Sequence, residues 1–387
     1  MKRITSIDAV RGFVMVVMAL DHVRDLIHIN ALKFDPTDLA TTTSSLFYTR
    51  WITHLCAPTF VFLSGVSAYL AYANSSDPAN SKKFLLKRGL WLVLLEVTVV
   101  NFSIWFDIHF GVIMLQVIAA IGFGFILLTF FLRVKPLYNF IIAIGITLLC
   151  NLVMGLNLSQ YPILSFFYNL LLSPNLLQIT PNFMLLINYP VLPWFGIMLA
   201  GFACGLLFTQ PAEIRAKRFI SISALLFFAF VLLRFVNVWG DPAPWSMQKD
   251  VIFTFLSFIN ISKYPPSLLF ILITLSVSFF LLFIAEKFGG KWKEVMMVYG
   301  SVPMFYYLIH FYLIHSIALL VLLAQGFAWS DFRFGPFQFG RPEAPSGLGL
   351  GGVYIFRIGV VVLLYPLCKK YSAYKKAHPE KAWLRYL

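Results

Sequence analysis

The feature that most constrains this chain is a series of apolar runs, each about as long as a membrane is thick. A helix needs about 20 apolar residues to cross the hydrocarbon core, and ten such runs can be placed along the 387 residues. Hydrophobic residues make up 60% of the chain and charged residues only 12%, whereas soluble domains carry about 25% charged residues. We therefore expect an all-α, polytopic transmembrane helix bundle. The expected helices cover residues 10–29, 53–73, 88–106, 109–132, 137–157, 185–210, 217–237, 266–285, 296–324 and 349–368.

The basic residues predict the orientation of the chain. Cytoplasmic loops of membrane proteins carry an excess of Lys and Arg. With the N-terminus inside, most of the 30 Lys and Arg residues fall in cytoplasmic segments, although the outer loops are longer. We therefore expect both termini in the cytoplasm, and this topology explains the net charge of +14 without a nucleic-acid partner. The inner segments hold Lys2, Arg3, Lys82, Lys83, Lys87, Arg88, Arg133, Lys135, Arg215, Lys217, Arg218, Lys287, Lys291, Lys293 and the basic tail 369–387.

Three outer segments are expected to lie beside the bundle rather than to cross it. Residues 161–172 and 251–259 are apolar but too short to span, so we expect interfacial or re-entrant helices there. The loop 326–348 is rich in Gly, Pro and Phe and is expected to form an irregular outer cap. No linker or composition shift divides the chain, so residues 1–387 are expected to form one domain. The basic tail is expected to contact anionic membrane lipid.

The first expected helix carries six ionisable side chains in an apolar setting. Charged groups near the centre of a bilayer cost several kcal/mol, so they need a structural or functional reason. On an ideal helix Arg11 and His22 share one stripe, separated by roughly 16 Å of rise. A second stripe holds Asp21, Asp25 and His28. A seam of ion pairs explains Arg11 and Arg24, whereas a functional role explains Asp21 and His22 better, because both lie near mid-membrane.

The second and ninth expected helices carry further histidines. Arg50 and His54 are four residues apart at the outer end of the second helix, so we expect them to face the same side. They are either interface anchors or a substrate-facing pair. Pro303 is expected to kink the ninth helix. His310 then lies near mid-helix, where a packing role and a functional role are equally open.

The remaining polar residues at membrane depth suggest more modest roles. Glu96 and Arg357 are expected to pair as a structural bridge, and Lys263 and Tyr264 to point towards an outer vestibule. Small residues such as Gly65 and Gly201 permit close helix packing. The Cys and His spacing matches no metal-binding pattern, so we expect no metal.

Several ordered motifs resemble a known family. The chain is similar to bacterial members of the heparan-alpha-glucosaminide N-acetyltransferase-like family, and Arg11-x10-His22 resembles a signature of membrane acyltransferases that modify surface polysaccharides. The matching blocks are Ser6-Ile-Asp-x-x-Arg-Gly, Met18-x-x-Asp-His-x-Arg24, Ala57-Pro-x-Phe-x-Phe-Leu-Ser-Gly65, Lys263-Tyr-Pro-Pro-Ser267 and Val302-Pro-x-Phe-Tyr-Tyr-Leu-x-His310.

The resemblance implies acyl transfer across a bacterial cytoplasmic (inner) membrane. An acyl-CoA, by this resemblance acetyl-CoA, would be used from the inside, and a sugar or glycan acceptor would be modified outside. His22 would be the catalytic histidine, and Arg11 would contact the CoA phosphates or the acyl carbonyl. The resemblance to the lysosomal members does not extend to the position of His22, so His28 and His54 remain alternatives for that role.

The chemistry of acyl transfer suits these residue types. Neutral imidazole can take the acceptor proton at pH 7, and whether His22 is a base or an acyl carrier stays open. Asp21 points about 100° away from His22 on the helix, so we expect a carboxylate on another element to orient His22. The developing oxyanion needs hydrogen-bond donors, and Arg11, Tyr306 or Tyr307 could supply them.

We therefore expect a membrane acyltransferase acting on a carbohydrate hydroxyl or amine. The rival interpretation is a proton-coupled transporter with Asp21, His22 and Glu96 as a relay. A homodimer, the acyl group and the acceptor are left open. The expected catalytic residues are His22, Asp21 and His310, the acyl-CoA-binding residues are Arg11, Tyr306 and Tyr307, and the acceptor-binding residues are Asp25, His28, Arg50, His54, Lys263 and Tyr264.

Overall fold

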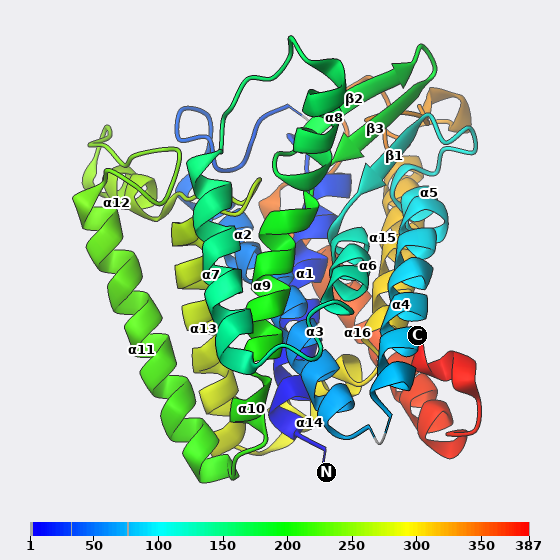
Figure 1. Cartoon of the computed structure of the whole chain (residues 1–387). Helices are drawn as coiled ribbons and strands as arrows, with labels where there is room; N and C mark the ends of the chain where they lie inside the picture. The colour runs from blue at the N-terminus through cyan, green and yellow to red at the C-terminus, as the bar shows by residue number, and fades with distance from the viewer. Residues whose placement is uncertain (1–2, 32, 76, 387) are drawn as a thin grey trace.

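The computed structural model describes residues 3–31, 33–75 and 77–386, so Lys2 and Leu387 of the expected inner segments lie outside it. The described chain forms a helical bundle around α1 (Thr5–Ile27), which is buried along most of its length. This helix packs against α3 (Cys56–Ala73), α13 (Leu268–Lys287), α14 (Lys291–Gly300), α15 (Pro303–Ala324) and α16 (Leu350–Ala377). The helix whose charged residues the sequence singled out therefore lies at the centre of the bundle (Figure 1).

The other helices follow the expected apolar runs, with breaks. Pro303 is the first residue of α15, so it separates two helices instead of kinking one. The fourth expected helix and the sixth each begin with a strand. The remaining helices are α2 (Ser44–Trp51), a 3₁₀ turn (Ile52–Leu55), α4 (Pro78–Leu95), a π-helical turn (Glu96–Val100), α5 (Asn101–Trp105), α6 (Val117–Leu128), α7 (Pro136–Leu152), α8 (Pro162–Leu171), α9 (Val191–Ala203), α10 (Gly205–Phe208), α11 (Ala212–Val236), α12 (Val251–Ile259) and short 3₁₀ turns at Trp329–Asp331 and Ala382–Arg385.

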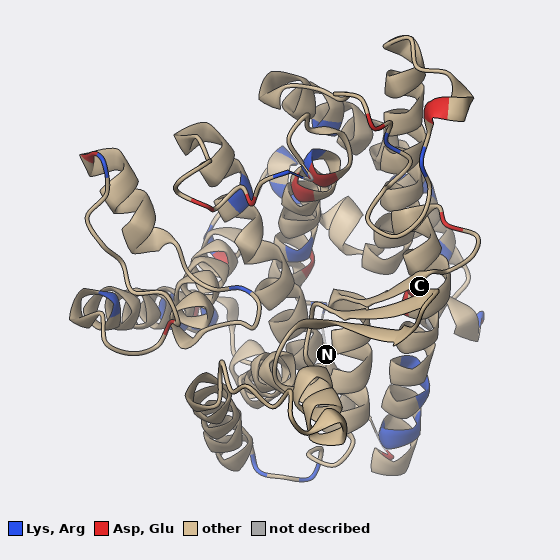
Figure 2. Ribbon diagram, turned by 90° about the horizontal axis from the view of Figure 1, so that it is seen from above, with Lys and Arg blue, Asp and Glu red and all other residues tan. Residues whose placement is uncertain are grey.

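Within the described residues, five helical segments are long and apolar enough to cross a membrane. Seen from above, many helices stand nearly end-on and most of the ribbon is uncharged (Figure 2). The protein is therefore a membrane protein, while the expected number of ten crossings stays a prediction. The five segments are Ser44–Ala73, Ala212–Val236, Leu268–Lys287, Pro303–Ala324 and Leu350–Ala377.

Glycines let the central helices approach closely. A Cβ on Gly12 of α1 would overlap the backbone carbonyl of Met296 on α14. A Cβ on Gly65 of α3 would likewise overlap the carbonyl of Met198 on α9. The reciprocal contact is made by Gly201, whose Cβ would overlap the carbonyl of Phe62. These contacts confirm the expected close packing at small residues and fix α1 and α3 in the bundle.

An ion pair ties three helices together near the start of α1. Arg215 of α11 donates two hydrogen bonds of 2.9 Å to the carboxylate of Glu286 on α13. Ser6, in the first turn of α1, donates to the same carboxylate at 2.6 Å. This two-pronged geometry orients both charged partners, and it holds the start of the central helix in place.

The described chain is mostly helical, as expected, but it also contains a small sheet, which an all-α fold does not have. Strand β1 (Val112–Leu115) pairs in parallel with β3 (Phe183–Ile187), and β2 (Asn175–Thr180) pairs antiparallel with β3. Asn101 helps to hold β1, because its side chain accepts from Met114 N and donates to Val112 O. A short apolar run next to a helix has no periodicity that separates a strand from one more helical turn.

The outer end of the bundle carries the sheet, α8, α12 and an irregular loop (Figure 1). Residues 162–171 and 251–259 form the short helices expected there. The loop 326–348 contains little regular structure, as expected. Its Phe337 and Phe339 pack against Trp105 with ring centroids 5.3 and 4.5 Å away, and this contact places that part of the loop beside α5.

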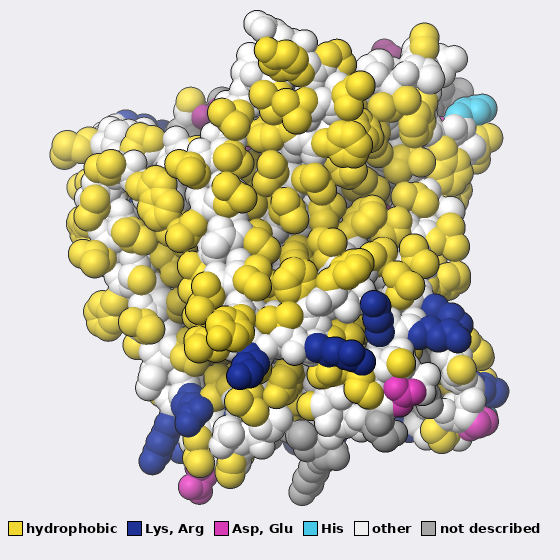
Figure 3. Space-filling model, in the orientation of Figure 1, with side chains coloured by type: hydrophobic (Ala, Val, Ile, Leu, Met, Phe, Trp, Pro, Cys, Tyr) yellow, Lys and Arg dark blue, Asp and Glu magenta, His cyan; other side chains and the backbone are white. Residues whose placement is uncertain are grey.

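Lys and Arg side chains gather in a band across the lower part of the molecule in Figure 3, below a broad apolar surface. The N-terminal end of α1 and the C-terminal end of α16 also lie in this lower part (Figure 1). This end is called the inner end below, and the opposite end the outer end.

Candidate functional site

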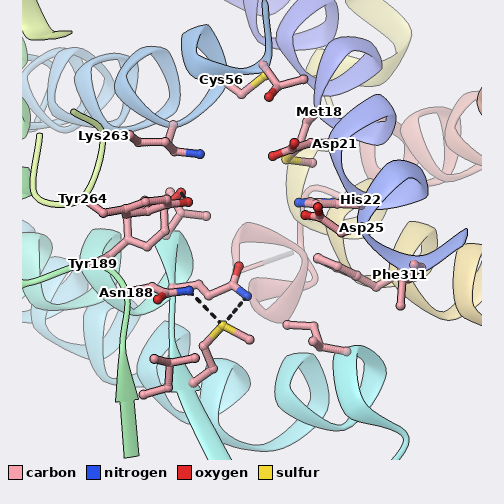
Figure 4. A pocket seen from close by; sticks show the side chains of 18 of the residues that line it. Met18, Asp21, His22, Asp25, Cys56, Asn188, Tyr189, Lys263, Tyr264 and Phe311 are labelled. Atoms are coloured by element: carbon pink, nitrogen blue, oxygen red, sulfur yellow. Dashed lines mark hydrogen bonds between the residues drawn. The ribbon is translucent and has the colours of Figure 1, made fainter. Parts of the chain in front are cut away.

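A cavity of about 300 Å³ lies in the outer half of the bundle. His22, Asp21 and Asp25 of α1 form one wall, and the segment before α13 forms the opposite wall with Lys263 and Tyr264 (Figure 4). Phe337 and Phe339 of the outer loop also line it. Most of the acceptor-binding residues expected from the sequence therefore share one cavity.

Asp21 is the most strongly paired group in this cavity. Its carboxylate accepts a hydrogen bond from Arg50 through one oxygen and one of 2.9 Å from Arg24 through the other. Arg24 also contacts Asp25 at 2.5 Å. Arg24 thus contacts both carboxylates, and Arg50 contacts Asp21. This network holds Asp21 against the wall and leaves its carboxylate little freedom to move.

Lys263 brings an ammonium group into the same cavity. Among the described residues no carboxylate lies within ion-pair distance of it. Its Nζ lies 4.9 Å from the centre of the Tyr264 ring and 6.0 Å from that of Tyr189, and Figure 4 shows it pointing into the cavity, towards the wall formed by α1. The segment Tyr264-Pro-Pro-Ser267 leads directly into α13, whose first turn is capped by Ser267 accepting from Phe270 N. This cap fixes where the segment leaves the cavity wall.

His22 lies between the cavity and α15. Its ring stacks on Phe311 with centroids 4.2 Å apart. Its Nδ1 lies 2.6 Å from Nε2 of His310, and an imidazole nitrogen of His22 points into the cavity (Figure 4). The structure thus brings together two of the three expected catalytic residues. Asp21 shares the cavity, but its hydrogen bonds go to the arginines rather than to His22.

A second cavity of about 200 Å³ lies in the inner half. Arg11 lines it and donates to Leu63 O at 3.0 Å and to the Ser67 hydroxyl. Arg88 lines it from α4, between the rings of Phe84 and Phe125, and its Nε has no hydrogen-bond partner among the described residues. Neither arginine forms an ion pair with a described carboxylate, so this cavity presents two guanidinium groups beside apolar side chains.

The inner cavity continues towards the inner end and also meets the outer one. Two further hollows adjoin it there, one through Arg11 and Ser67 and the other through Phe84 and Leu85. At its other end it shares Phe60, Val117 and Tyr307 with the outer cavity. Hollows therefore follow one another from the inner end to His22, and Tyr307 lies where the two cavities meet.

Three residues expected in the site lie elsewhere. His28 follows the last residue of α1 in an extended conformation and lines neither cavity. His54 lines a separate small cavity beside Phe270, whereas Arg50 lines the outer cavity. Residues 52–55 form a 3₁₀ turn, so the i, i+4 spacing of a regular helix does not describe the relation between Arg50 and His54. Tyr306 is fully buried and lines neither cavity.

Two pairings expected from the sequence are replaced by other contacts in the structure. Glu96 accepts from Ala119 N at 2.8 Å, in the first turn of α6, while Arg357 donates to Val16 O at 2.9 Å. The expected Glu96–Arg357 bridge is therefore wrong, and each group satisfies a backbone atom instead. A carboxylate was expected to orient His22, but the hydrogen-bond partner on its ring is the imidazole of His310.

Other residues of the site were not singled out from the sequence. Asn188 and Tyr189 line the outer cavity after β3, where a continuous helix was expected. The amides of Gln116 and Asn188 both donate to the sulfur of Met114 at 2.9 and 3.2 Å (Figure 4). Arg88 was assigned only to the inner basic cluster. The adjacent Asn188-Tyr-Pro190 was the available signal, because a proline favours an extended residue before it and often begins a helix.

Comparison with known proteins identifies the family of the chain. The sequence model of the family described as heparan-alpha-glucosaminide N-acetyltransferase, catalytic, matches residues 3–237. The matched range contains Arg11, His22, Arg50 and Arg88, whereas Lys263 and His310 lie beyond it. No curated protein matches the chain. Since the match covers more than half of the 387 residues, this chain belongs to the heparan-alpha-glucosaminide N-acetyltransferase catalytic family of membrane acetyltransferases.

Proposed function

We propose that this chain transfers an acetyl group from acetyl-CoA at its inner end to a carbohydrate hydroxyl or amine at its outer end, with His22 as general base. The observation that carries the proposal is the meeting of the two cavities at Phe60, Val117 and Tyr307, beside His22. A donor in one cavity and an acceptor in the other would meet there without either crossing the membrane.

The inner cavity fits the chemistry of an acyl-CoA. Guanidinium groups bind phosphates through directed hydrogen bonds, and Arg11 and Arg88 both line this cavity without a described carboxylate partner. The apolar side chains of Ile118, Ile121 and Phe125 suit the less polar part of such a molecule. The inner end would therefore be cytoplasmic, in agreement with its band of Lys and Arg.

The outer cavity fits a polar acceptor. Its walls carry Asp25, Lys263, Tyr264 and Asn188, which together offer hydrogen-bond donors and acceptors of the kind that hydroxyl groups use. His22 lies at the boundary of this cavity, so a bound hydroxyl or amine could reach its imidazole. Lys263 would bind an anionic group on the acceptor, because no described carboxylate neutralises it.

The rival transporter mechanism finds less support. Its relay requires Glu96, yet this carboxylate accepts from a backbone amide at the start of α6 and lines neither cavity. Asp21, the second member of the relay, is held by two arginines. The three groups of the relay therefore do not follow one path between the two cavities.

The test measures free CoA thiol released from acetyl-CoA by the purified protein in proteoliposomes, with a panel of amino sugars and neutral hexoses as acceptors. We expect release that depends on an acceptor, and a fall of about 10²- to 10⁴-fold in His22→Ala, the usual contribution of a general base. A folded His22→Ala protein that acetylates at the wild-type rate would exclude His22 as the base. Acceptor movement without thiol release would favour the transporter.

His28→Ala and His54→Ala are the matched variants. Both remove a histidine that the family resemblance left as an alternative, and neither side chain lines the two cavities. We expect both variants to keep most of the activity. Loss of turnover in either of them, with His22→Ala still active, would move the catalytic assignment to that residue.

A further inference from the structure

The surrounding hydrogen bonds determine which ring donates and which accepts in the contact between His22 and His310. His310 is completely buried on α15, and its Nδ1 lies 2.5 Å from the carbonyl oxygen of Tyr307 and 3.2 Å from that of Tyr306. A carbonyl oxygen only accepts hydrogen bonds. The hydrogen of the neutral His310 ring is therefore on Nδ1, and its Nε2 carries a lone pair.

The lone pair of His310 in turn determines the tautomer of His22. His310 Nε2 lies 2.6 Å from His22 Nδ1, and a hydrogen bond needs one donor. His22 must therefore carry its hydrogen on Nδ1, which leaves its Nε2 as the basic nitrogen. No described residue hydrogen-bonds to that Nε2, and a ring nitrogen of His22 points into the outer cavity in Figure 4. Neither imidazole forms an ion pair with a described carboxylate.

We propose that His310 is a positioning residue that holds His22 in the Nδ1–H tautomer, so that Nε2 faces the acceptor as the base. This inference rests on the proposed function. In many hydrolases a carboxylate fixes the tautomer of the catalytic histidine; here a second imidazole, itself fixed by a backbone carbonyl, has that role. Asp21 does not fix the tautomer of His22, because its oxygens bind Arg24 and Arg50.

In the proposed transfer, one nitrogen, His22 Nε2, both takes up and returns the proton. His22 Nε2 takes the proton from the acceptor O–H or N–H as that oxygen or nitrogen bonds to the thioester carbonyl carbon. The C–S bond breaks, and the CoA thiolate takes the proton back from Nε2. Throughout, the Nδ1–H bond to His310 is retained, and it strengthens while His22 is an imidazolium, because charged donors form stronger hydrogen bonds.

A packing role is the alternative, since the His310 ring also stacks on Tyr306 with centroids 5.3 Å apart. Two substitutions separate the roles. His310→Gln places an amide oxygen near the former Nε2, where it can accept from His22, whereas His310→Phe fills the space without an acceptor. We expect kcat to fall by about 10- to 100-fold in His310→Phe. In His310→Gln kcat should stay within a few-fold of wild type, and KM for acetyl-CoA should change little in either.

A double-mutant cycle sharpens the test. Because His310 acts through His22, His310→Phe should cost no further residual activity in the His22→Ala background. If His310→Phe unfolds the protein, His310→Asn replaces it: its amide is too short to reach His22, and it should lose activity that His310→Gln keeps. The inference would be overturned if the fold-losses of His22→Ala and His310→Phe multiplied in the double variant. It would also be overturned if His310→Gln had the same kcat as His310→Phe, or as His310→Asn where that variant replaces it. Absence of acetyl transfer in the wild type would instead overturn the proposed function.

Discussion

Two consecutive tyrosines on α15 have similar burial but different surroundings. The hydroxyls of Tyr306 and Tyr307 are both buried without a hydrogen-bond partner among the described residues. Tyr307 lines both cavities, whereas Tyr306 packs against Tyr299 with ring centroids 5.5 Å apart. An unpaired hydroxyl at the meeting point of the cavities can donate to the oxygen of a thioester as negative charge develops on it.

Tyr307→Phe should therefore lower kcat by about 10²- to 10³-fold, the usual cost of removing an oxyanion donor. Tyr306→Phe is the matched control, because it removes the neighbouring unpaired hydroxyl without touching either cavity, and it should leave kcat close to wild type. Steady-state rates of thiol release, measured with both substrates varied, give kcat and KM for each variant. An equal effect of both changes would exclude this role for Tyr307.

Part of this site could be predicted from the sequence. Helical periodicity alone places Asp21 and Asp25 on one wall of α1, because both lie on the same regular helix. The His22–His310 pair could not be predicted, since 288 residues separate its members and no local pattern connects them. That His54 lines a different cavity from Arg50 could not be predicted either, because an i, i+4 rule does not describe the 3₁₀ turn at residues 52–55.

At the scale of helices, the close crossing of α3 and α9 depends on two glycines, which have no side chain at the contact. Gly65 and Gly201 each approach a backbone carbonyl of the partner helix. Helix association in membranes gains from such close packing, since lipid removes the hydrophobic contribution. The α3 helix also carries Phe60, which lines both cavities, so this crossing positions one of the residues where the cavities meet.

Gly65→Ala should destabilise the protein by about 1–3 kcal/mol, as added volume does in a well-packed core. Gly359→Ala on α16 is the control, because a Cβ there meets no atom within 4 Å. This change should be neutral or stabilising by up to about 1 kcal/mol, as expected of Ala over Gly in a helix. Thermal unfolding in detergent measures both. A Gly65→Ala protein as stable as Gly359→Ala would contradict the close crossing.

The helices were predictable where an apolar run begins and ends with clear signals, as at Pro136 of α7 and Ser267 before α13. The sheet was not. Val112–Leu115 is as apolar as the helix that follows it, and it becomes a strand because β3, some seventy residues later in the chain, offers a partner edge. Pairing between distant segments decides this element, and a local window contains no trace of it.

At the scale of the whole molecule, charge and cavities are both asymmetric. Lys and Arg gather at the inner end (Figure 3), where the cavity lined by Arg11 and Arg88 also lies. The outer cavity has its own polar lining, and in the described part of the chain it shares three lining residues with the inner one. The donor and the acceptor should therefore be usable from one side each.

Sealed vesicles test this sidedness. Acetyl-CoA added outside inside-out vesicles, with a sugar acceptor enclosed, should give acetylated acceptor in the lumen, because the inner end then faces the added donor. Right-side-out vesicles with the same contents should give none until detergent opens them. Equal activity of both sealed preparations would contradict the proposed orientation, and activity in the right-side-out preparation alone would reverse it.

If the proposed transfer takes place where Phe60, Val117 and Tyr307 line both cavities, it has an energetic consequence for the cell. If only a two-carbon group passes that point, the nucleotide carrier never leaves its own compartment and needs no recycling route. Phe60 and Val117 are apolar, so an ion moving between the cavities would lose hydration there. A membrane voltage is worth about 2.3 kcal/mol per charge at 100 mV, so an enzyme built in this way could decorate external sugars without discharging the gradient that powers its host.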